Sequence, residues 1–263
     1  MKDKKNYTEL LSFAYFPTYD ESVKFLAESL AEKEEWDFTD SQNKNYGILK
    51  NYLEHTYRRL KQEDKISFTN NNSHACFNTG LITENLEDIF ALFEKNKNTG
   101  PGCQQFFFRA FLKRSDNQII KYFSATIPEP ANYFQKPEQL LFNPNCNIVP
   151  DYDHILKDRV ERFPAHLKDA DLPELRRQLV GGIEDVRKKV RTNYTIAVPQ
   201  CYRGQINLLL PLCLTSGSKN PDLALTIFRV DPNTYSAKTC LTLRMAYQAA
   251  RLITKPQSNW LKP

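Results

Sequence analysis

Four apolar segments separated by short polar stretches lie near the C-terminus, at residues 194–201, 205–215, 223–230 and 235–241. Tyr202-Arg203-Gly204 connects the first two. Asp231-Pro232-Asn233-Thr234 connects the last two, with proline at the position that a turn favours. Two consecutive hairpins predict an antiparallel sheet. Residues 242–253 follow with helical spacing, and we expect them to form a helix mostly buried against this sheet.

Further upstream, the spacing of the apolar residues alternates between helical and extended patterns. Helices are expected over five segments, at about 22–35, 46–63, 86–93, 151–163 and 172–190. A hairpin is expected around Asn70-Asn71-Asn72-Ser73, and a strand over the phenylalanine-rich segment 104–113. Prolines between residues 124 and 151 predict an ordered irregular segment. The fold class is therefore α+β: an antiparallel sheet of consecutive hairpins packed with N-terminal, central and C-terminal helices.

The length of 263 residues favours one domain, residues 1–263, in which 1–35 form an N-terminal helical extension. A hydrophobic content of 41% and a charged content of 25% exclude a mainly disordered chain. Eight glycines, where average usage of about 7% would give roughly 18, argue against a glycine-rich phosphate loop. Residues 176–203 contain seven Lys and Arg residues against only Glu184 and Asp185. This segment forms either a patch for a polyanion or a helix with charges spread around a solvated surface.

The six cysteines never occur as C-x-x-C and have no histidine pair at zinc spacing. Several stand inside apolar runs, which predicts small buried hydrophobic residues in a reducing compartment. No acidic cluster has the spacing of a metal site, so we expect no required metal and no cofactor. No apolar stretch approaches the roughly 20 residues that cross a bilayer, and we expect a soluble cytoplasmic protein without a membrane partner.

An ordered series of short motifs covers about residues 35–262. It comprises Trp36, Gly47-Ile48-Leu49-Lys50-Asn51-Tyr52-Leu53, Phe77-Asn78-Thr79-Gly80-Leu81, Asp151-x-x-His154-Ile155, Asn193-Tyr194, Val198-Pro199-Gln200, Leu209-Leu210-Pro211-Leu212, Asp222-Leu223-Ala224-Leu225 and the segment 241–253. Together these motifs resemble the domain of unknown function 3825. The resemblance implies a family-like core over 36–262.

The resemblance also implies an RNA-related role, because such domains are often joined to RNA-binding modules of the winged-helix and cold-shock kinds. It brings no established reaction. The chain departs from the family pattern at Arg244, where the family tends to have an acidic residue, and at Gln248 or Ala249, where it tends to have asparagine.

Two motifs outside the late hairpins carry candidate functional residues. Asn78 and Thr79 are expected at a strand-to-helix turn. Such a turn can direct backbone N–H groups and side-chain amides toward a phosphate or a base. The alternative is a turn that only caps the following helix. His154 follows Asp151 and Asp153, and a carboxylate neighbour would make it a general acid or base. A structural histidine is the alternative. His74 is a second histidine for such chemistry.

The first late hairpin has the densest mixture of polar and aromatic residues in the chain: Arg191, Asn193, Tyr194, Gln200, Tyr202, Arg203 and Gln205. Such residues stack on unpaired bases, neutralise phosphates and contact base edges. The alternative is that they face solvent, as in any half-buried strand. Tyr247 and Arg251 share one face of the last helix, where Arg251 either binds a ligand or pairs with Asp222.

The sequence therefore predicts an RNA-binding protein that engages single-stranded RNA or a nucleotide-like ligand in a polar-aromatic cleft. Asn78, Thr79, His154, the 191–205 segment, Tyr247 and Arg251 are its expected lining residues. The first alternative is a metal-independent RNA-processing enzyme, cleaving phosphodiesters or modifying ends with His154. The second is a protein-interaction scaffold without a ligand.

Overall fold

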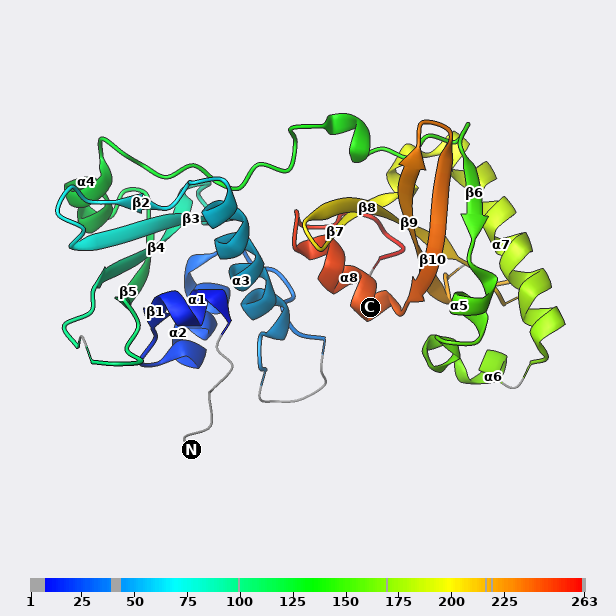
Figure 1. The fold of residues 1–263 in the computed structure, drawn as a ribbon, viewed down its shortest axis with the longest axis horizontal. Coiled ribbons are helices and arrows are strands. Elements are labelled where there is room, and N and C mark those ends of the chain that lie inside the picture. Colours follow the sequence, from blue (N-terminus) through cyan, green and yellow to red (C-terminus); the bar gives the residue numbers. More distant parts are fainter. Residues whose placement is uncertain are drawn as a thin grey trace. The chain divides into compact units, whose positions relative to one another are not determined.

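The computed structural model describes residues 8–38, 44–98, 100–168, 170–215, 217–218 and 220–261. The chain forms two compact units, Met1–Asn132 and Tyr133–Pro263, and each contains its own five-stranded sheet (Figure 1). The expected α+β class is confirmed. The division into two compact units does not test whether the chain folds as one domain, so the expectation of a single domain stays a prediction.

The first unit combines a sheet with helices from both ends of its sequence. Its elements are α1 (Glu9–Phe13), β1 (Ala14–Tyr15), α2 (Tyr19–Phe25) continuing into a π-helical turn (Leu26–Leu30), α3 (Gly47–Gln62), β2 (Ser67–Phe68), β3 (His74–Ile82), β4 (Asp88–Lys95), β5 (Phe106–Lys113) and α4 (Asn117–Phe123). The strand order is β1-β5-β4-β3-β2, antiparallel except between β1 and β5. The predicted helix at 46–63, the hairpin and the strand at 104–113 are confirmed.

The helix predicted over 86–93 is wrong, because this segment forms strand β4. Its residues Ile89–Phe93 are completely buried. Phe90 packs with Ile119 and Phe123 of α4, whereas Phe93 contacts Phe77 and Phe108 through its ring. Because both faces of this central strand are covered, its apolar residues form an unbroken run, which periodicity cannot distinguish from a buried helix.

A close contact joins α3 to β3 in the first unit. The Tyr52 hydroxyl donates a hydrogen bond of 2.8 Å to the Thr79 carbonyl. The next residue, Gly80, has a φ of +72° and lies where the β3–β4 register shifts between Asn78 and Ile82. A Cβ at this position would lie 2.6 Å from the Tyr52 hydroxyl oxygen, so the contact requires glycine for both its conformation and its size.

A histidine in α3 makes the first unit sensitive to acid. Burial, with Arg58 and Arg59 nearby, lowers the pKa of His55 to about 4. The unfolded chain, with a histidine pKa near 6.5, therefore binds more protons than the folded chain between these two values. We expect the free energy of unfolding to fall by up to about 3 kcal/mol as the pH decreases through this range.

Urea unfolding at about pH 7 and about pH 4.5 measures this loss of stability. His55→Gln should reduce the difference between the two pH values. A variant that loses as much stability as the wild type on acidification would show that other groups are responsible.

The second unit follows a segment with little regular structure. Its elements are a 3₁₀ turn (Pro137–Gln139), β6 (Asn147–Pro150), α5 (Tyr152–Leu156), a 3₁₀ turn (Val160–Arg162), α6 (Ala165–Lys168), α7 (Leu172–Thr192), a 3₁₀ turn (Tyr194–Ile196), β7 (Val198–Tyr202), β8 (Gln205–Leu212), β9 (Leu223–Asp231), β10 (Thr234–Leu241) and α8 (Leu243–Arg251). The strand order is β6-β10-β9-β8-β7, and only β6 runs parallel to its neighbour. Both predicted hairpins and the helices at 172–190 and 242–253 are confirmed.

Two boundaries in this unit differ from the prediction. The helix expected over 151–163 ends at Leu156 and is followed by a separate 3₁₀ turn, so the segment is not one continuous helix. The strand expected from residue 194 begins only at Val198, because the Asn193 side chain accepts a hydrogen bond from the Thr195 backbone and closes a turn.

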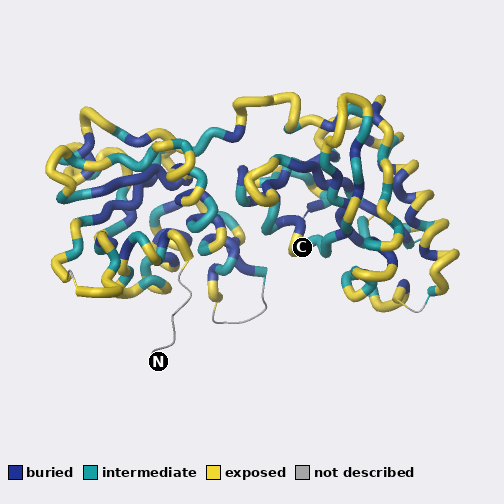
Figure 2. The backbone as a smooth tube through the Cα atoms, viewed as in Figure 1, coloured by how far each residue is buried: buried dark blue, intermediate teal, exposed yellow. Residues whose placement is uncertain are grey.

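Helix α7 covers one face of the second sheet. Its buried residues Leu179, Ile183 and Val186 pack in one core with Leu208, Leu210 and Leu212 of β8, and with alternate residues of β9 and β10. Figure 2 shows buried backbone, in dark blue, along the strands of this unit. Asp171 caps this helix by accepting a hydrogen bond of 2.8 Å from the Glu174 amide. The side chains that point away from α7 therefore form the opposite face of the sheet.

The two edge strands of this sheet each contain a proline. Pro150 ends β6, and Pro199 lies within β7, opposite Leu208.

Helix α8 packs against β7, β9 and β10. Its residues Ala246, Tyr247 and Ala250 are buried.

None of the helices in the described ranges is both long enough and apolar enough to cross a membrane.

Candidate functional site

The face of the second sheet opposite α7 carries polar and aromatic side chains on four neighbouring strands, β7 to β10. Strand register places them together: Gln200 is paired with Asn207, Tyr202 with Gln205, and Phe228 with Ser236. Asn207 lies one position beyond the Leu208–Ile227 pair and is therefore next to Phe228. We call this set the polar-aromatic face and define it as Gln200, Tyr202, Gln205, Asn207, Phe228 and Lys238.

Tyr202 and Arg203 form the exposed tip of the β7–β8 hairpin. Arg203 and Gly204 both have positive φ values, 51° and 78°, as a type I′ turn requires. This turn leaves the Tyr202 side chain 57% exposed, and the Arg203 guanidinium carbon lies 5.2 Å from the centre of its ring. The tip thus presents an aromatic surface beside a permanent positive charge.

Phe228 and Lys238 repeat this combination on β9 and β10. The Lys238 ammonium group is exposed and lies 5.7 Å from the centre of the partly exposed Phe228 ring. The sequence analysis missed Phe228, Lys238 and Asn207, although it identified Gln200, Tyr202 and Gln205. Phe228 and Lys238 are far from β7 in sequence, and only the strand register places them on this face. Asn207 lies in the same hairpin as Gln200 and pairs with it across β7 and β8.

Tyr247 and Arg251 are both buried in α8, the helix that packs against β7. Both residues therefore belong to the helix that lies next to β7, the strand that carries Gln200. The alternative prediction of an Arg251–Asp222 ion pair is wrong. The Asp222 carboxylate instead accepts hydrogen bonds of 2.7 and 2.9 Å from the Leu214 and Thr215 backbone amides, and a third from the Thr215 hydroxyl.

Arg191, Asn193 and Tyr194 lie at the other end of β7 from Tyr202. Five strand residues, about 15 Å of extended chain, separate the two groups, so they do not form one cluster. The Asn193 side chain caps the turn by accepting hydrogen bonds from the Thr195 backbone and hydroxyl. Tyr194 is 69% exposed and Arg191 is also exposed.

Asn78 and Thr79 belong to the first unit and are buried within β3. Their side chains stabilise the chain itself: the Asn78 carbonyl oxygen accepts from the Gly80 amide at 2.8 Å, and the Thr79 hydroxyl donates to the Ile89 carbonyl at 2.7 Å. The predicted strand-to-helix turn is absent because β4, not a helix, follows. These contacts agree with the structural alternative for the two residues.

His154 lies in α5 of the second unit, and its ring is 34% exposed. Its carboxylate neighbour is Asp158, whose Oδ2 lies 3.0 Å from His154 Nδ1, whereas Asp151 caps the helix by accepting from the His154 amide. An imidazole oriented in this way can serve as a general base through its other nitrogen. His74, in the first unit, stacks on Tyr122 with ring centres 4.0 Å apart.

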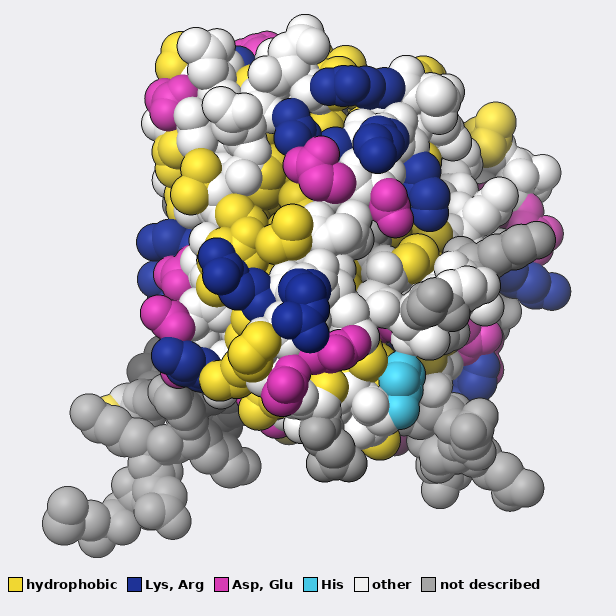
Figure 3. Space-filling view, turned by 90° about the vertical axis from the view of Figure 1, so that its right-hand side faces the viewer, with side chains coloured by type: hydrophobic (Ala, Val, Ile, Leu, Met, Phe, Trp, Pro, Cys, Tyr) yellow, Lys and Arg dark blue, Asp and Glu magenta, His cyan; other side chains and the backbone are white. Residues whose placement is uncertain are grey.

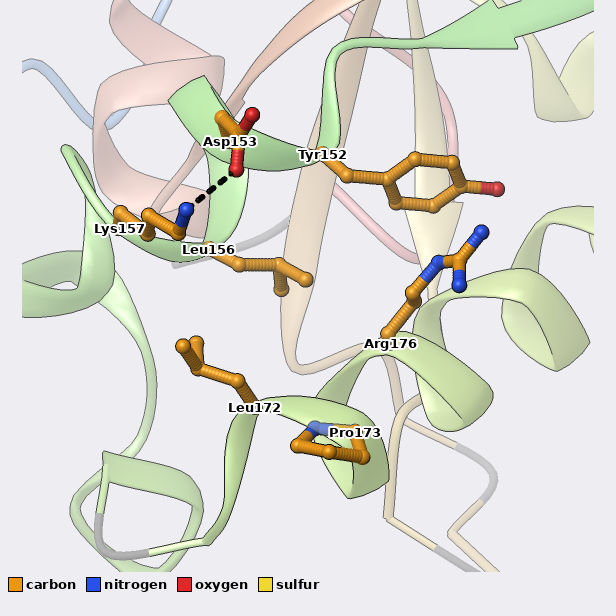
Figure 4. A pocket seen from close by; sticks show the side chains of 7 residues that line it. All are labelled: Tyr152, Asp153, Leu156, Lys157, Leu172, Pro173 and Arg176. Atoms are coloured by element: carbon orange, nitrogen blue, oxygen red, sulfur yellow. Dashed lines mark ion pairs between the residues drawn. The ribbon is translucent and has the colours of Figure 1, made fainter.

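A pocket of about 400 Å³ lies between α5 and the first turn of α7 (Figure 4). Leu156, Leu172 and Pro173 form its apolar part. The Arg176 guanidinium lies 4.9 Å from the centre of the Tyr152 ring, and Asp153 and Lys157 form an ion pair of 2.7 Å. His154 is not among its lining residues, so the imidazole and this pocket are separate features of α5.

The basic residues of α7 are spread rather than gathered. Arg177 pairs with Glu174 and Arg187 with Glu184, at 3.2 and 2.9 Å. On the α7 side of the second unit, Lys and Arg side chains alternate with acidic ones around an apolar strip (Figure 3). This arrangement agrees with the alternative of a solvated helix surface.

No group of three or more potential ligands for a metal ion occurs among the residues that the structure describes. All six cysteines are free thiols, and four of them are buried. Burial raises the pKa of the Cys76 and Cys240 thiols, so neither supplies a thiolate nucleophile at neutral pH.

Comparison with known families covers residues 27–260, nearly the whole chain, and the matching family is described as a domain of unknown function, DUF3825. The chain belongs to the DUF3825 family. The matched residues include both compact units, so the β7–β8 hairpin and α8 are parts of the DUF3825 domain and not appendages to it. Neither the curated proteins nor the solved structures include a match to this chain.

Proposed function

We propose that this DUF3825 protein binds single-stranded RNA on the polar-aromatic face of its second sheet. The observation that carries the proposal is the pair of accessible rings, Tyr202 and Phe228, each next to a cation on the same face. Single-stranded nucleic acids bind to such surfaces by stacking unpaired bases on aromatic rings while Lys and Arg neutralise phosphates.

Two further considerations support RNA as the ligand. Domains that this chain resembles are often joined to RNA-binding modules, and here the exposed residues Tyr202, Gln205 and Lys238 are of the kinds that such contacts use. The accessible part of this face is the region of Tyr202, Gln205 and Lys238, whereas Gln200 and Asn207 are buried. Six free thiols fit a cytoplasmic location, where RNA is available.

The direct test is fluorescence anisotropy with labelled single-stranded RNA, duplex RNA and single-stranded DNA across a salt series. We expect saturable binding of single-stranded RNA that weakens as salt increases, because bound phosphates release counterions. Absence of binding to all three polymers would contradict the proposal and favour a protein-interaction scaffold.

Lys238→Gln tests the role of the face more specifically. If Lys238 neutralises one phosphate, the slope of log K against log salt should decrease by about 0.7, the value for one contact to a single strand. Lys121→Gln is the matched control, because the Lys121 ammonium lies 5.0 Å from the Tyr122 ring in the first unit. Equal slopes for the wild type and Lys238→Gln would show that Lys238 does not contact a phosphate of the bound RNA.

A second candidate function is RNA processing by His154, favoured by the 3.0 Å contact between its imidazole and Asp158. General base catalysis needs an oriented imidazole, which this contact provides. After each binding experiment the RNA should be run on a denaturing gel. Shortened or altered RNA that disappears with His154→Ala, while binding persists, would establish this activity; unaltered RNA with the wild type would contradict it.

A further inference from the structure

The pocket between α5 and the first turn of α7 takes part in neither function proposed above (Figure 4). Its volume is about 400 Å³, and all of its lining residues belong to the second unit. The polar-aromatic face shares no residue with it. Small-molecule sites have volumes of roughly 300–1,000 Å³ and are mostly apolar with a few polar groups, so this pocket has the size of a ligand site.

Most of the pocket wall is apolar. Leu156 is buried and belongs to the core of the unit, whereas Leu172 and Pro173 come from the start of α7. In Figure 4, Leu156 lies across the pocket from these two residues. Leu172 is 45% exposed, so part of the apolar wall faces solvent. An apolar group that covers this wall removes it from water, which favours binding.

Arg176 brings a positive charge to the edge of this apolar wall. Its guanidinium contacts the Tyr152 ring, and within the described ranges it forms no ion pair and donates no hydrogen bond. The other cation of the pocket, Lys157, is already paired with Asp153 at 2.7 Å. The lining residues therefore carry one net positive charge, and it belongs to Arg176. A guanidinium binds a carboxylate through two parallel N–H···O hydrogen bonds.

We propose that this pocket binds a small monocarboxylate with an apolar body, such as a medium-chain aliphatic acid. The apolar body lies against Leu156, Leu172 and Pro173, and the carboxylate accepts hydrogen bonds from Arg176. A nucleotide suits the pocket less well, because its polar base edges would lie against apolar walls without hydrogen-bond partners. An amine would place a second positive charge beside Arg176. The proposal does not depend on RNA binding.

Isothermal titration calorimetry of the full chain with octanoate, hexanoate and hexanamide at neutral pH tests the proposal. We expect octanoate to bind at a single site, roughly tenfold more tightly than hexanoate, because each further buried CH₂ group strengthens binding about fourfold. Hexanamide has nearly the shape of hexanoate but no charge, and it should bind roughly tenfold more weakly. No saturable binding of octanoate, or equal binding of hexanoate and hexanamide, would overturn the proposal.

Arg176→Gln tests the charged part of the site. This variant should bind octanoate roughly tenfold more weakly than the wild type, because the carboxylate loses its charged partner. Arg177→Gln is the matched control: this neighbouring arginine is paired with Glu174, does not line the pocket, and should be replaceable without effect on octanoate. Equal octanoate affinities of Arg176→Gln and Arg177→Gln would contradict the assigned position of the carboxylate and with it the proposal.

Leu172→Gln tests the apolar wall. We expect it to weaken octanoate binding roughly fivefold, since part of the apolar contact is lost. Val180→Gln is the control, because Val180 is a similarly exposed apolar residue of α7 outside the pocket. Both side chains are largely exposed, so thermal unfolding should show two folded proteins with similar Tm. The same octanoate affinity in both variants would overturn the proposed position of the ligand.

Discussion

Replacing Tyr202 by alanine is expected to weaken the binding of single-stranded RNA by roughly 5- to 100-fold. Alanine substitutions of base-stacking aromatics in such proteins cost about 1–3 kcal/mol each. The substitution removes the most exposed ring of the polar-aromatic face and also the ring beneath the Arg203 guanidinium. Anisotropy titrations of one labelled oligonucleotide with both proteins measure the change.

Two variants determine what the loss means. Tyr202→Phe keeps the ring and should retain most of the affinity, which separates stacking from a contact of the hydroxyl group. Tyr15→Ala removes a tyrosine that is 46% exposed in the first unit, and it should bind as the wild type does. If Tyr202→Ala and Tyr15→Ala bind equally well, the hairpin tip is not part of the interface.

The largest expected effect on stability comes from Gly80→Ala in the first unit. Alanine at a φ of +72° costs about 1–2 kcal/mol in backbone strain. The new Cβ also lies 2.6 Å from the Tyr52 hydroxyl oxygen, which must move from its hydrogen bond to the Thr79 carbonyl, a buried contact worth about 1–3 kcal/mol. We expect the free energy of unfolding to decrease by about 2–4 kcal/mol.

Urea unfolding of the full chain, followed by circular dichroism, measures this decrease. Gly47→Ala is the control in the same unit, because no atom lies within 4 Å of the added Cβ and helix α3 begins there. It should leave the stability unchanged or raise it by up to about 1 kcal/mol. Equal free energies of unfolding for the two variants would show that Tyr52 can move away from Gly80 and lose its hydrogen bond to Thr79 without measurable loss of stability.

The double substitution separates the two causes. In Tyr52→Phe the hydroxyl oxygen is gone, so Gly80→Ala should cost only the backbone strain when it is introduced into that variant. The difference between the two costs is the coupling between Tyr52 and Gly80.

The late hairpins were predictable from the sequence because short turns separate their strands. Strand pairing between neighbours in sequence needs only local information. Strand β4 was not predictable in this way, because its run from Ile89 to Phe93 is apolar on both faces and carries no period. The parallel pairing of β6 with β10 depends on residues almost ninety positions apart, which no local pattern reports.

The candidate site likewise contains residues that local sequence could identify and residues that only strand pairing brings together. Gln200, Tyr202 and Gln205 belong to one hairpin, and their polar-aromatic mixture is visible in consecutive residues. Phe228 and Lys238 resemble ordinary surface residues in the sequence, and only the register brings them to the same face. At Asn78 the sequence pattern was misleading in the opposite sense: it suggested a phosphate-binding turn, whereas the Asn78 side chain stabilises an irregularity within β3.

The prolines in the edge strands limit how other chains can add to the second sheet. Pro199 has no backbone N–H, so the outer edge of β7 lacks a donor where a further strand would need one, and Pro150 interrupts the opposite edge in the same way. Lateral growth of the sheet, whether by an extended peptide or by a second copy of the chain, is therefore disfavoured at both borders. The RNA binding proposed for this unit therefore depends on side chains of the sheet and not on the addition of a strand at either border.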